Sequence, residues 1–313
     1  MSAPWIVVAG ATGTGKSDLA AGLAARVGGE IVNYDSVQIY RGFDIGSAKP
    51  DAALRVRVPH HLYDAVDPDH EINAAEYARM AERACGDIER RGHRPLLVGG
   101  TGFWLRALLA GLPEMPGRDT SVRRRLRALL ETSRGAARAH RWLARVDPVA
   151  AARIAPADRH RVERALEVWI LTGEPISDRT PPGPGSPRRP SVVLAVRYPR
   201  DLLRERLDAR VDAMYARGLV EETRDLVARW GPAARPFGSI GYAEALNVVA
   251  GKMNLETAIA ETKRRTRAYA KRQMTWLRAE RDVHWLEAPR PLDALIDEAI
   301  AIVRSPGRPT DNQ

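Results

Sequence analysis

The segment GATGTGKS, from Gly10 to Ser17, has the residue types and spacing of a phosphate-binding loop, G-x-x-x-x-G-K-[ST]. Its glycines let the backbone bend so that successive N–H groups face an anion, and a helix that starts at the end of the loop adds the positive end of its dipole. Lys16 supplies a positive charge, and the Ser17 hydroxyl is a ligand for Mg²⁺. The residues expected to hold the phosphate are Gly10, Thr12, Gly13, Thr14, Gly15, Lys16 and Ser17.

A carboxylate, Asp35, closes the apolar segment EIVNYDS and is the second group that could do chemistry. In an open parallel sheet the strand ends face the ligand crevice, so Asp35 is expected to lie across from the phosphate loop. P-loop enzymes that hydrolyse nucleotides usually carry an acidic residue at the end of another strand, but the run from Val98 to Thr101 has none. Asp35 is therefore a candidate base, although an N-cap of a following helix is an equally good interpretation.

Short apolar runs that alternate with helical stretches must position these groups. We predict strands at 6–9, 30–35, 94–98, 191–198 and 283–288. The helical pattern between them, as in AAEYARMAERACGDIERRG, predicts an α/β fold in which a P-loop parallel sheet is covered by helices on both faces.

This alternation stops between the third and fourth strands. The chain is Arg-rich and helical in period there, and it ends in DRTPPGPGSPRRPS, which cannot continue any element. We predict an inserted all-helical domain at 112–191, between core segments 1–111 and 192–305, with a flexible tail at 306–313. The alternative is that these helices belong to the outer layer of the sheet.

The formal net charge of +10 over 313 residues is concentrated in two segments. From Arg118 to Glu167 there are 13 arginines against 6 acidic residues, and from Lys263 to Arg281 there are 8 basic residues against 1 glutamate. This favours a polyanionic partner such as RNA, although solvated helix faces are the alternative. The single cysteine, Cys85, excludes an internal disulfide, and no apolar run could span a bilayer, so a cytoplasmic location is expected.

Several long blocks are similar to those of the bacterial tRNA isopentenyltransferase (tRNA dimethylallyltransferase) family, in the same order. They include GATGTGKS, NYDSVQIYRGFDIGSAKP, LLVGGTGFWLRALLAGL, RALEVWILTGEPIS, SIGYAEAL and TRAYAKRQMTWLR. The resemblance implies transfer of a dimethylallyl group from dimethylallyl diphosphate to N6 of the adenine immediately 3′ of the tRNA anticodon, with a P-loop core and a helical insertion as the fold. It also implies that Asp35 is the general base, that Thr101 lines the reaction channel, and that Arg210 reaches the diphosphate.

The same resemblance implies a set of tRNA contacts and a Mg²⁺ cofactor bound through Ser17. The matching positions are Asp35, Ser36, Val37, Gln38, Thr101, Arg123, His160, Arg161 and Arg164. Lys271 and Arg272 join this set because the C-terminal basic stretch has the composition of an RNA-facing helix, although its aromatic residues could equally pack on the core. The adjacent histidines His60 and His61 are expected on a loop, without a metal-binding role.

Three other functions use part of these features. A small-molecule kinase needs a P-loop and a carboxylate at a strand end, but neither basic segment. A prenyltransferase acting on free adenine nucleotides has no use for the basic segments, and a non-enzymatic RNA-binding protein has no use for the phosphate loop. Prenyl transfer to the anticodon stem-loop of tRNA by a monomeric enzyme uses all three features: the phosphate loop, the carboxylate at a strand end and the basic segments.

Overall fold

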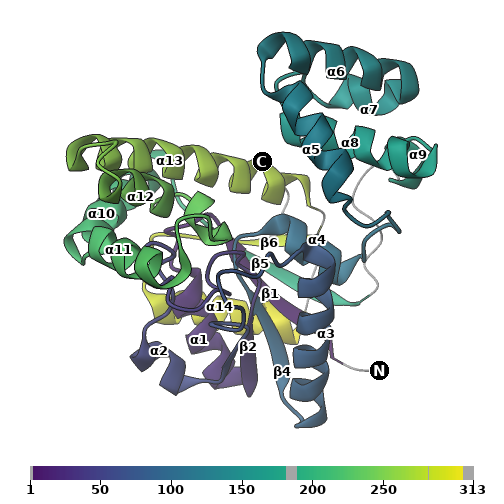
Figure 1. Ribbon diagram of the computed structural model, residues 1–313. Helices are drawn as coiled ribbons and strands as arrows, with labels where there is room; N and C mark the ends of the chain where they lie inside the picture. Colours follow the sequence, from purple (N-terminus) through teal and green to yellow (C-terminus); the bar gives the residue numbers. More distant parts are fainter. Residues whose placement is uncertain (1–2, 181–188, 281, 306–313) are drawn as a thin grey trace. The chain divides into compact units, whose positions relative to one another are not determined.

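A computed structural model describes residues 3–180, 189–280 and 282–305. A parallel sheet of six strands, in the order β3-β2-β4-β1-β5-β6, forms the centre of the larger of two compact units (Figure 1). The strands are β1 Trp5–Gly10, β2 Gly29–Asn33, β3 His60–His61, β4 Arg94–Val98, β5 Ser191–Arg197 and β6 Val283–Glu287. The α/β class and the P-loop sheet core predicted from the sequence are confirmed.

Two details of the predicted strands are wrong. Strand β2 ends at Asn33, so Asp35 lies two residues beyond it. His60 and His61 form the short edge strand β3 and pair with Ile31 and Val32 of β2. A strand of two residues is too short to show any period, which is why the sequence pattern indicated a loop.

Helices α1 (Lys16–Val27) and α14 (Leu292–Arg304) cover one face of the sheet. Leu19 and Leu23 of α1 and Ile296 of α14 belong to the same buried apolar cluster as alternate residues of the strands. The two helices approach closely at Gly22, where an added Cβ would lie 2.4 Å from the Cδ1 atom of Ile296. This packing fixes the start of α1, and with it the phosphate loop, against the sheet.

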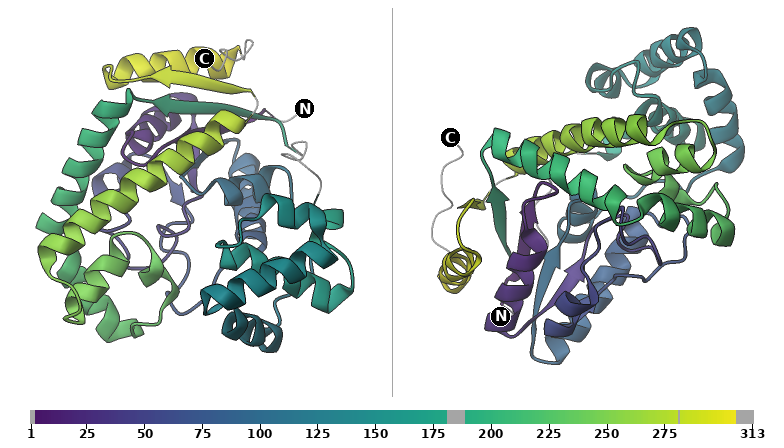
Figure 2. Two further views of the ribbon diagram at one scale, coloured as in Figure 1. Left: turned by 90° about the horizontal axis from the view of Figure 1, so that it is seen from above. Right: turned by 90° about the vertical axis from the view of Figure 1, so that its left-hand side faces the viewer.

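Helices α3 (Ala74–Arg90) and α13 (Leu255–Ala279) also pack on the sheet, and α4 (Gly102–Leu109) packs against both of them. Tyr77 of α3 stacks on Trp104 of α4 with ring centroids 4.4 Å apart. Helix α13 contacts β1 and α4, and α10 (Arg200–Ala216) runs beside it (Figure 2). The remaining elements of this unit are α2 Ala52–Arg57, α11 Leu219–Trp230, η1 Arg235–Gly238 and α12 Tyr242–Val249.

The second compact unit, residues 112–185, is helical over its described part. Its helices are α5 Thr120–Leu130, α6 Ser133–Val146, α7 Pro148–Arg153, α8 Arg159–Thr172 and α9 Ile176–Arg179. Leu126, Leu143 and Leu166 belong to a core of its own. Ser191 is the first residue of β5, so the sheet unit resumes before the boundary expected from the sequence.

The tail expected to be flexible, 306–313, lies outside the described residues. Over the described ranges, no helix combines the length and the apolar character needed to cross a membrane.

Candidate active site

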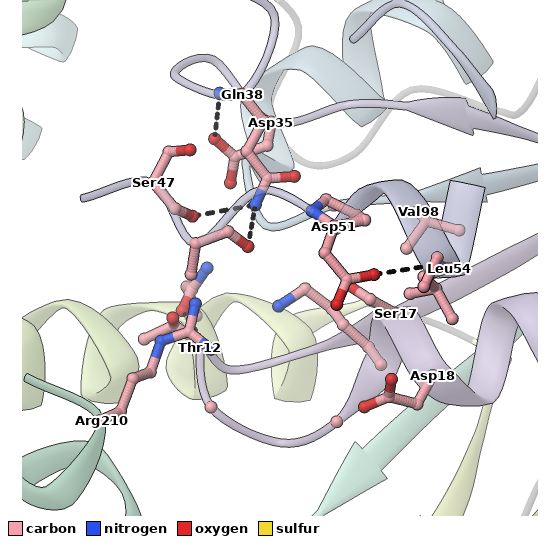
Figure 3. A pocket seen from close by; sticks show the side chains of 18 of the residues that line it. Thr12, Ser17, Asp18, Asp35, Gln38, Ser47, Asp51, Leu54, Val98 and Arg210 are labelled. Atoms are coloured by element: carbon pink, nitrogen blue, oxygen red, sulfur yellow. Dashed lines mark hydrogen bonds between the residues drawn. The ribbon is translucent and has the colours of Figure 1, made fainter. Parts of the chain in front are cut away.

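A pocket of about 430 Å³ opens where strands β1, β2 and β4 end. The phosphate loop forms one wall through residues such as Thr12 and Ser17, and Asp35 and Arg210 come from other segments (Figure 3). The structure therefore brings together the loop, the carboxylate and the arginine that the sequence singled out separately.

The phosphate loop has a backbone that requires its glycines. Gly13 and Gly15 have φ angles of 80° and 79°, in the left-handed region that glycine adopts most readily. At Gly10, with φ at 149°, an added Cβ would lie 2.7 Å from the Oγ1 atom of Thr14. Thr14 is buried and donates a hydrogen bond of 2.9 Å to the carbonyl of Ala11, which closes the loop on itself. Helix α1 begins at Lys16, so its free N–H groups face the pocket.

Two cations, Lys16 and Arg210, line the pocket together. Enclosure by the protein and the nearby charge of Arg210 lower the pKa of Lys16 to about 8, against the opposing effect of Asp35. Enclosure also lowers the pKa of Arg210, while the charge of Asp35 raises it. Two enclosed positive charges beside a helix start form a site for a polyanion, because an anion relieves the cost of holding them together.

Asp35 is held in a defined orientation by its own turn. Its Oδ1 atom accepts hydrogen bonds from the backbone N–H groups of Val37, at 2.9 Å, and Gln38, at 3.3 Å. No helix starts after Asp35, because turns follow it, so the side chain caps a turn rather than a helix. Thr101 stabilises the same segment, accepting a hydrogen bond of 3.0 Å from the N–H of Ser36.

A second pocket, of about 310 Å³, shares Thr12, Asp35 and Arg210 with the first. Ser36 and Arg272, two of the positions expected to contact tRNA, also line it. Its other walls include the apolar side chains of Val37, Val211, Met214 and Ile240. Asp35 can therefore be reached by groups that occupy either pocket.

Two residues of α13 that were not predicted from the sequence, Gln273 and Tyr269, join the site. Gln273 accepts a hydrogen bond of 2.8 Å from the N–H of Thr12 and donates one of 3.0 Å to the carbonyl of Gly100. Tyr269 donates to the same carbonyl at 3.2 Å and lines both pockets. The block TRAYAKRQMTWLR contains both residues, so the resemblance was the one signal that could have found them.

Helices α11 and α12 hold the loop that closes the pocket near Gln38. The carboxylate of Glu222 accepts hydrogen bonds from the N–H of Ile45 and from the hydroxyl of Tyr242. The side chain of Gln38 donates a bond of 2.9 Å to the carbonyl of Ser47 in the same loop. These contacts explain why residues far along the chain are needed to shape this wall.

The basic stretch of α13 is largely compensated by acidic neighbours. Four of its cations form ion pairs, Lys263 with Asp212, Arg264 with Glu261, Arg265 with Glu244 and Arg267 with Asp208. Lys271 and Arg272 are exposed, and within the described part of the chain neither forms an ion pair. The guanidinium of Arg272 lies over the ring of Tyr269, 5.7 Å from its centroid.

The expected tRNA contacts in the second unit have very different surroundings. His160 and Arg161 are exposed at the start of α8, where Arg161 pairs with Asp158. Arg164 is half-buried and donates to Glu167 at 2.6 Å. Arg123 is 9% exposed and donates to both carboxylate oxygens of Glu167. This burial argues against a direct contact of Arg123 with RNA, and it gives the side chain a place in the core of the unit.

The donors around the pocket suit Mg²⁺ bound jointly with a diphosphate. The Ser17 hydroxyl and the Asp18 and Asp35 carboxylates are hard oxygen donors, which this ion prefers, and it often takes only one or two protein ligands beside substrate phosphates. Among the residues the structure describes, no three His, Cys, Asp or Glu side chains are grouped to hold a metal ion without a substrate.

Two family models match the chain, IPP transferase over residues 38–280 and isopentenyl transferase over residues 5–62. The chain is 48% identical to the tRNA dimethylallyltransferase of Geobacter metallireducens, over 93% of this chain and 94% of the relative. It is 47% identical to the tRNA dimethylallyltransferase of Anaeromyxobacter dehalogenans, over 93% and 97%.

Solved structures give the same result. The tRNA isopentenylpyrophosphate transferase of Bacillus halodurans matches with a TM-score of 0.72 and 35% identity, over 97% of this chain and 96% of that one. A eukaryotic dimethylallyltransferase, described as acting on tRNA, matches with a TM-score of 0.79 and 30% identity, over 97% and 79%.

Proposed function

The chain belongs to the IPP transferase family of tRNA dimethylallyltransferases, and on this premise we propose which residues carry out its reaction. The reaction is transfer of a dimethylallyl group from dimethylallyl diphosphate to N6 of the adenine immediately 3′ of the anticodon in tRNA. The kinase and the free-nucleotide alternatives are not favoured, because the curated relatives are named as tRNA enzymes over nearly their whole length.

The phosphate loop and Arg210 bind the diphosphate of the donor. Negative charge grows on the leaving oxygens as the bond to the prenyl carbon breaks, and fixed cations and N–H groups near those oxygens stabilise it. Lys16, Arg210 and the start of α1 lie around one pocket and can serve in this way. Removal of one such group typically costs about 10²- to 10³-fold in rate.

Asp35 accepts the proton that the adenine must lose. The N6 atom attacks C1 of the dimethylallyl group, the C1–O bond breaks with its electrons going to diphosphate, and a hydrogen on N6 passes to the Asp35 carboxylate. Thr101 and the Val37 and Gln38 N–H groups orient the segment that carries this carboxylate.

The adenine approaches from the side of the second pocket. Its lining includes Ser36, Val37 and Arg272, three of the expected tRNA contacts, as well as Asp35 itself. A base held in a stacked loop must be extracted into a pocket before an enzyme can act on its edge. The donor in the first pocket and the adenine in the second then meet at Asp35.

Ser17 would hold Mg²⁺ together with the substrate oxygens, and the bound ion would supply positive charge that stabilises the departing diphosphate. A cytoplasmic location agrees with the substrate and with the single cysteine, Cys85, which is buried and free.

The observation that carries this proposal is the shared position of Asp35 on the walls of both pockets. The test is a transfer assay with labelled dimethylallyl diphosphate, Mg²⁺ and either an anticodon stem-loop or free AMP as acceptor. We expect label on the stem-loop alone, and a rate about 10²- to 10⁴-fold lower for Asp35→Asn. Label on AMP would return the function to free nucleotides, and an unchanged rate in the variant would exclude Asp35 as the base.

A further inference from the structure

Helix α6 of the second unit carries four arginines on one face. Arg134, Arg138, Arg141 and Arg145 are spaced by four, three and four residues, and all four side chains are exposed. Residues three and four apart on a helix are neighbours, so these side chains form one row about 16 Å long. We call this row the α6 arginine stripe.

The opposite face of α6 is committed to the core of the unit. Ala136, Ala139 and Leu143 are buried and pack in the same cluster as Leu126 and Leu166. Helix α6 contacts α5, α7 and α8 through this side (Figure 1). The stripe must therefore face away from the core, since a helix presents only one side to it.

Acidic side chains do not neutralise the stripe. Helix α6 contains no Asp or Glu, and over the described residues none of the four arginines forms an ion pair. The acids nearby are used elsewhere, Asp119 and Asp147 as helix caps, Asp158 with Arg161, and Glu163 and Glu167 with Arg123. Glu131 precedes the helix and is not paired with Arg134 in the part of the chain described.

This situation contrasts with that of α13, the other basic segment. There, four cations are matched one to one by carboxylates, as described above. Like charges along one helix face repel one another, so a row without counter-charges costs stability in the free protein. A polyanion that binds along the row removes this cost.

We propose that the α6 arginine stripe binds the phosphate backbone of the double-helical stem of the tRNA. The inference rests on the proposed function, which supplies tRNA as the partner. A row of evenly spaced arginines suits regular phosphates rather than bases, and double-stranded RNA is recognised mainly through its backbone. The stripe thus adds affinity for tRNA without sequence specificity, and it takes no part in the chemistry at Asp35.

The test uses the full chain with all four arginines of the stripe changed to Gln, together with a charge-preserving variant in which they become Lys. A matched control changes four exposed arginines of the sheet unit to Gln, Arg79, Arg83, Arg217 and Arg229. Binding of full-length tRNA and of a single-stranded oligonucleotide with the anticodon-loop sequence is measured from 50 to 300 mM KCl, a range chosen for salt sensitivity.

For the Gln variant we expect the slope of log Kd against log salt for tRNA to fall by about 3 to 4, and Kd at low salt to rise about 10- to 100-fold. The Lys variant and the control variant should keep the wild-type slope to within about 1. The rate at saturating tRNA should not change, because none of the four arginines lines either of the two pockets that contain Asp35.

An unchanged slope in the Gln variant, or an equal loss in the control variant, would overturn the inference. An equal loss of affinity for the single-stranded oligonucleotide would also overturn it, because the stripe would then bind the loop rather than the stem. Thermal melting followed by circular dichroism checks that the variants are folded. Failure of the proposed function would be distinguishable, because the wild type would then transfer no label to tRNA at any salt concentration.

Discussion

The side-chain oxygen of Gln273 accepts a hydrogen bond of 2.8 Å from the backbone N–H of Thr12, although 261 positions separate the two residues. The same side chain donates to the carbonyl of Gly100, two residues beyond the end of β4. One amide from α13 therefore fixes the phosphate loop and the segment before Thr101 relative to each other. One side chain therefore links the two sides of the site that we propose for the diphosphate and for the adenine.

Gln273→Leu should weaken binding of the donor. The substitution leaves the Thr12 N–H and the Gly100 carbonyl without this partner, and the loss of one such bond costs about 1 to 2 kcal/mol. We expect KM for dimethylallyl diphosphate to rise about 10-fold. Steady-state kinetics at saturating tRNA measures it, and Thr275→Ala, an exposed position on the same helix, is the control. A donor KM equal to that of the wild type would show that the loop keeps its shape without Gln273.

Affinity for the diphosphate should fall as the pH rises through about 8. The pKa of Lys16 is lowered to about 8, chiefly because the protein encloses it, so its charge is lost well below the usual 10.5. The free enzyme is therefore predicted to bind inorganic diphosphate more weakly at pH 9 than at pH 7.5. Isothermal titration across this range measures the effect.

Lys16→Arg provides the matched comparison for this pH dependence, because an arginine keeps its charge over the same range. The variant should lose the inflection near pH 8, whatever its absolute affinity. An inflection that persisted in the arginine variant would assign the titration to another group. The same shift favours folding at higher pH, because the unfolded chain holds the lysine proton up to about pH 10.5 and the folded chain releases it near 8.

Glu30 at the start of β2 should contribute to stability and not to catalysis. It is 2% exposed, and although burial alone would raise its pKa, hydrogen bonds with Arg91, His61 and His93 lower the pKa to about 2. A depressed carboxylate pKa stabilises the fold above the ordinary value of 4.5, and the contribution is lost as the pH falls towards 2.

Glu30→Gln is therefore expected to cost about 3 kcal/mol at pH 7. Urea denaturation measures this difference, which should shrink between pH 4.5 and 2. Transfer activity at 25 °C should remain, because Glu30 lies at the end of the strand opposite the pocket. Glu82→Gln, at an exposed position of α3, is the control. A stability loss that did not depend on pH would contradict the assigned cause.

Local features of the sequence predicted the groups that do the chemistry, but they did not predict the residues that surround and position those groups. The motif from Gly10 to Ser17 and the strand before it are contiguous, so periodicity and turn chemistry were enough to place the phosphate loop. The role of Gln273 was not predictable, because its partners lie far away in the sequence and only the folded sheet brings them together. The partners of His61 and of Arg123 depended in the same way on tertiary contacts.

Arg123 gives the sharpest test of what tertiary contacts add to a sequence match. Its position implied a contact with tRNA, whereas its side chain is buried against Glu167, which is 0% exposed. Arg123→Ala should therefore destabilise the second unit by about 3 to 5 kcal/mol, because it leaves a buried carboxylate with fewer partners. Limited proteolysis should show faster cleavage within residues 112–185 than in the sheet unit.

The double variant Arg123→Leu, Glu167→Leu removes both charges and should recover much of the loss of stability. Arg124→Ala, at the exposed neighbouring position, should have little effect on stability. A stable Arg123→Ala protein with a shallower salt dependence of tRNA binding would instead restore the direct contact.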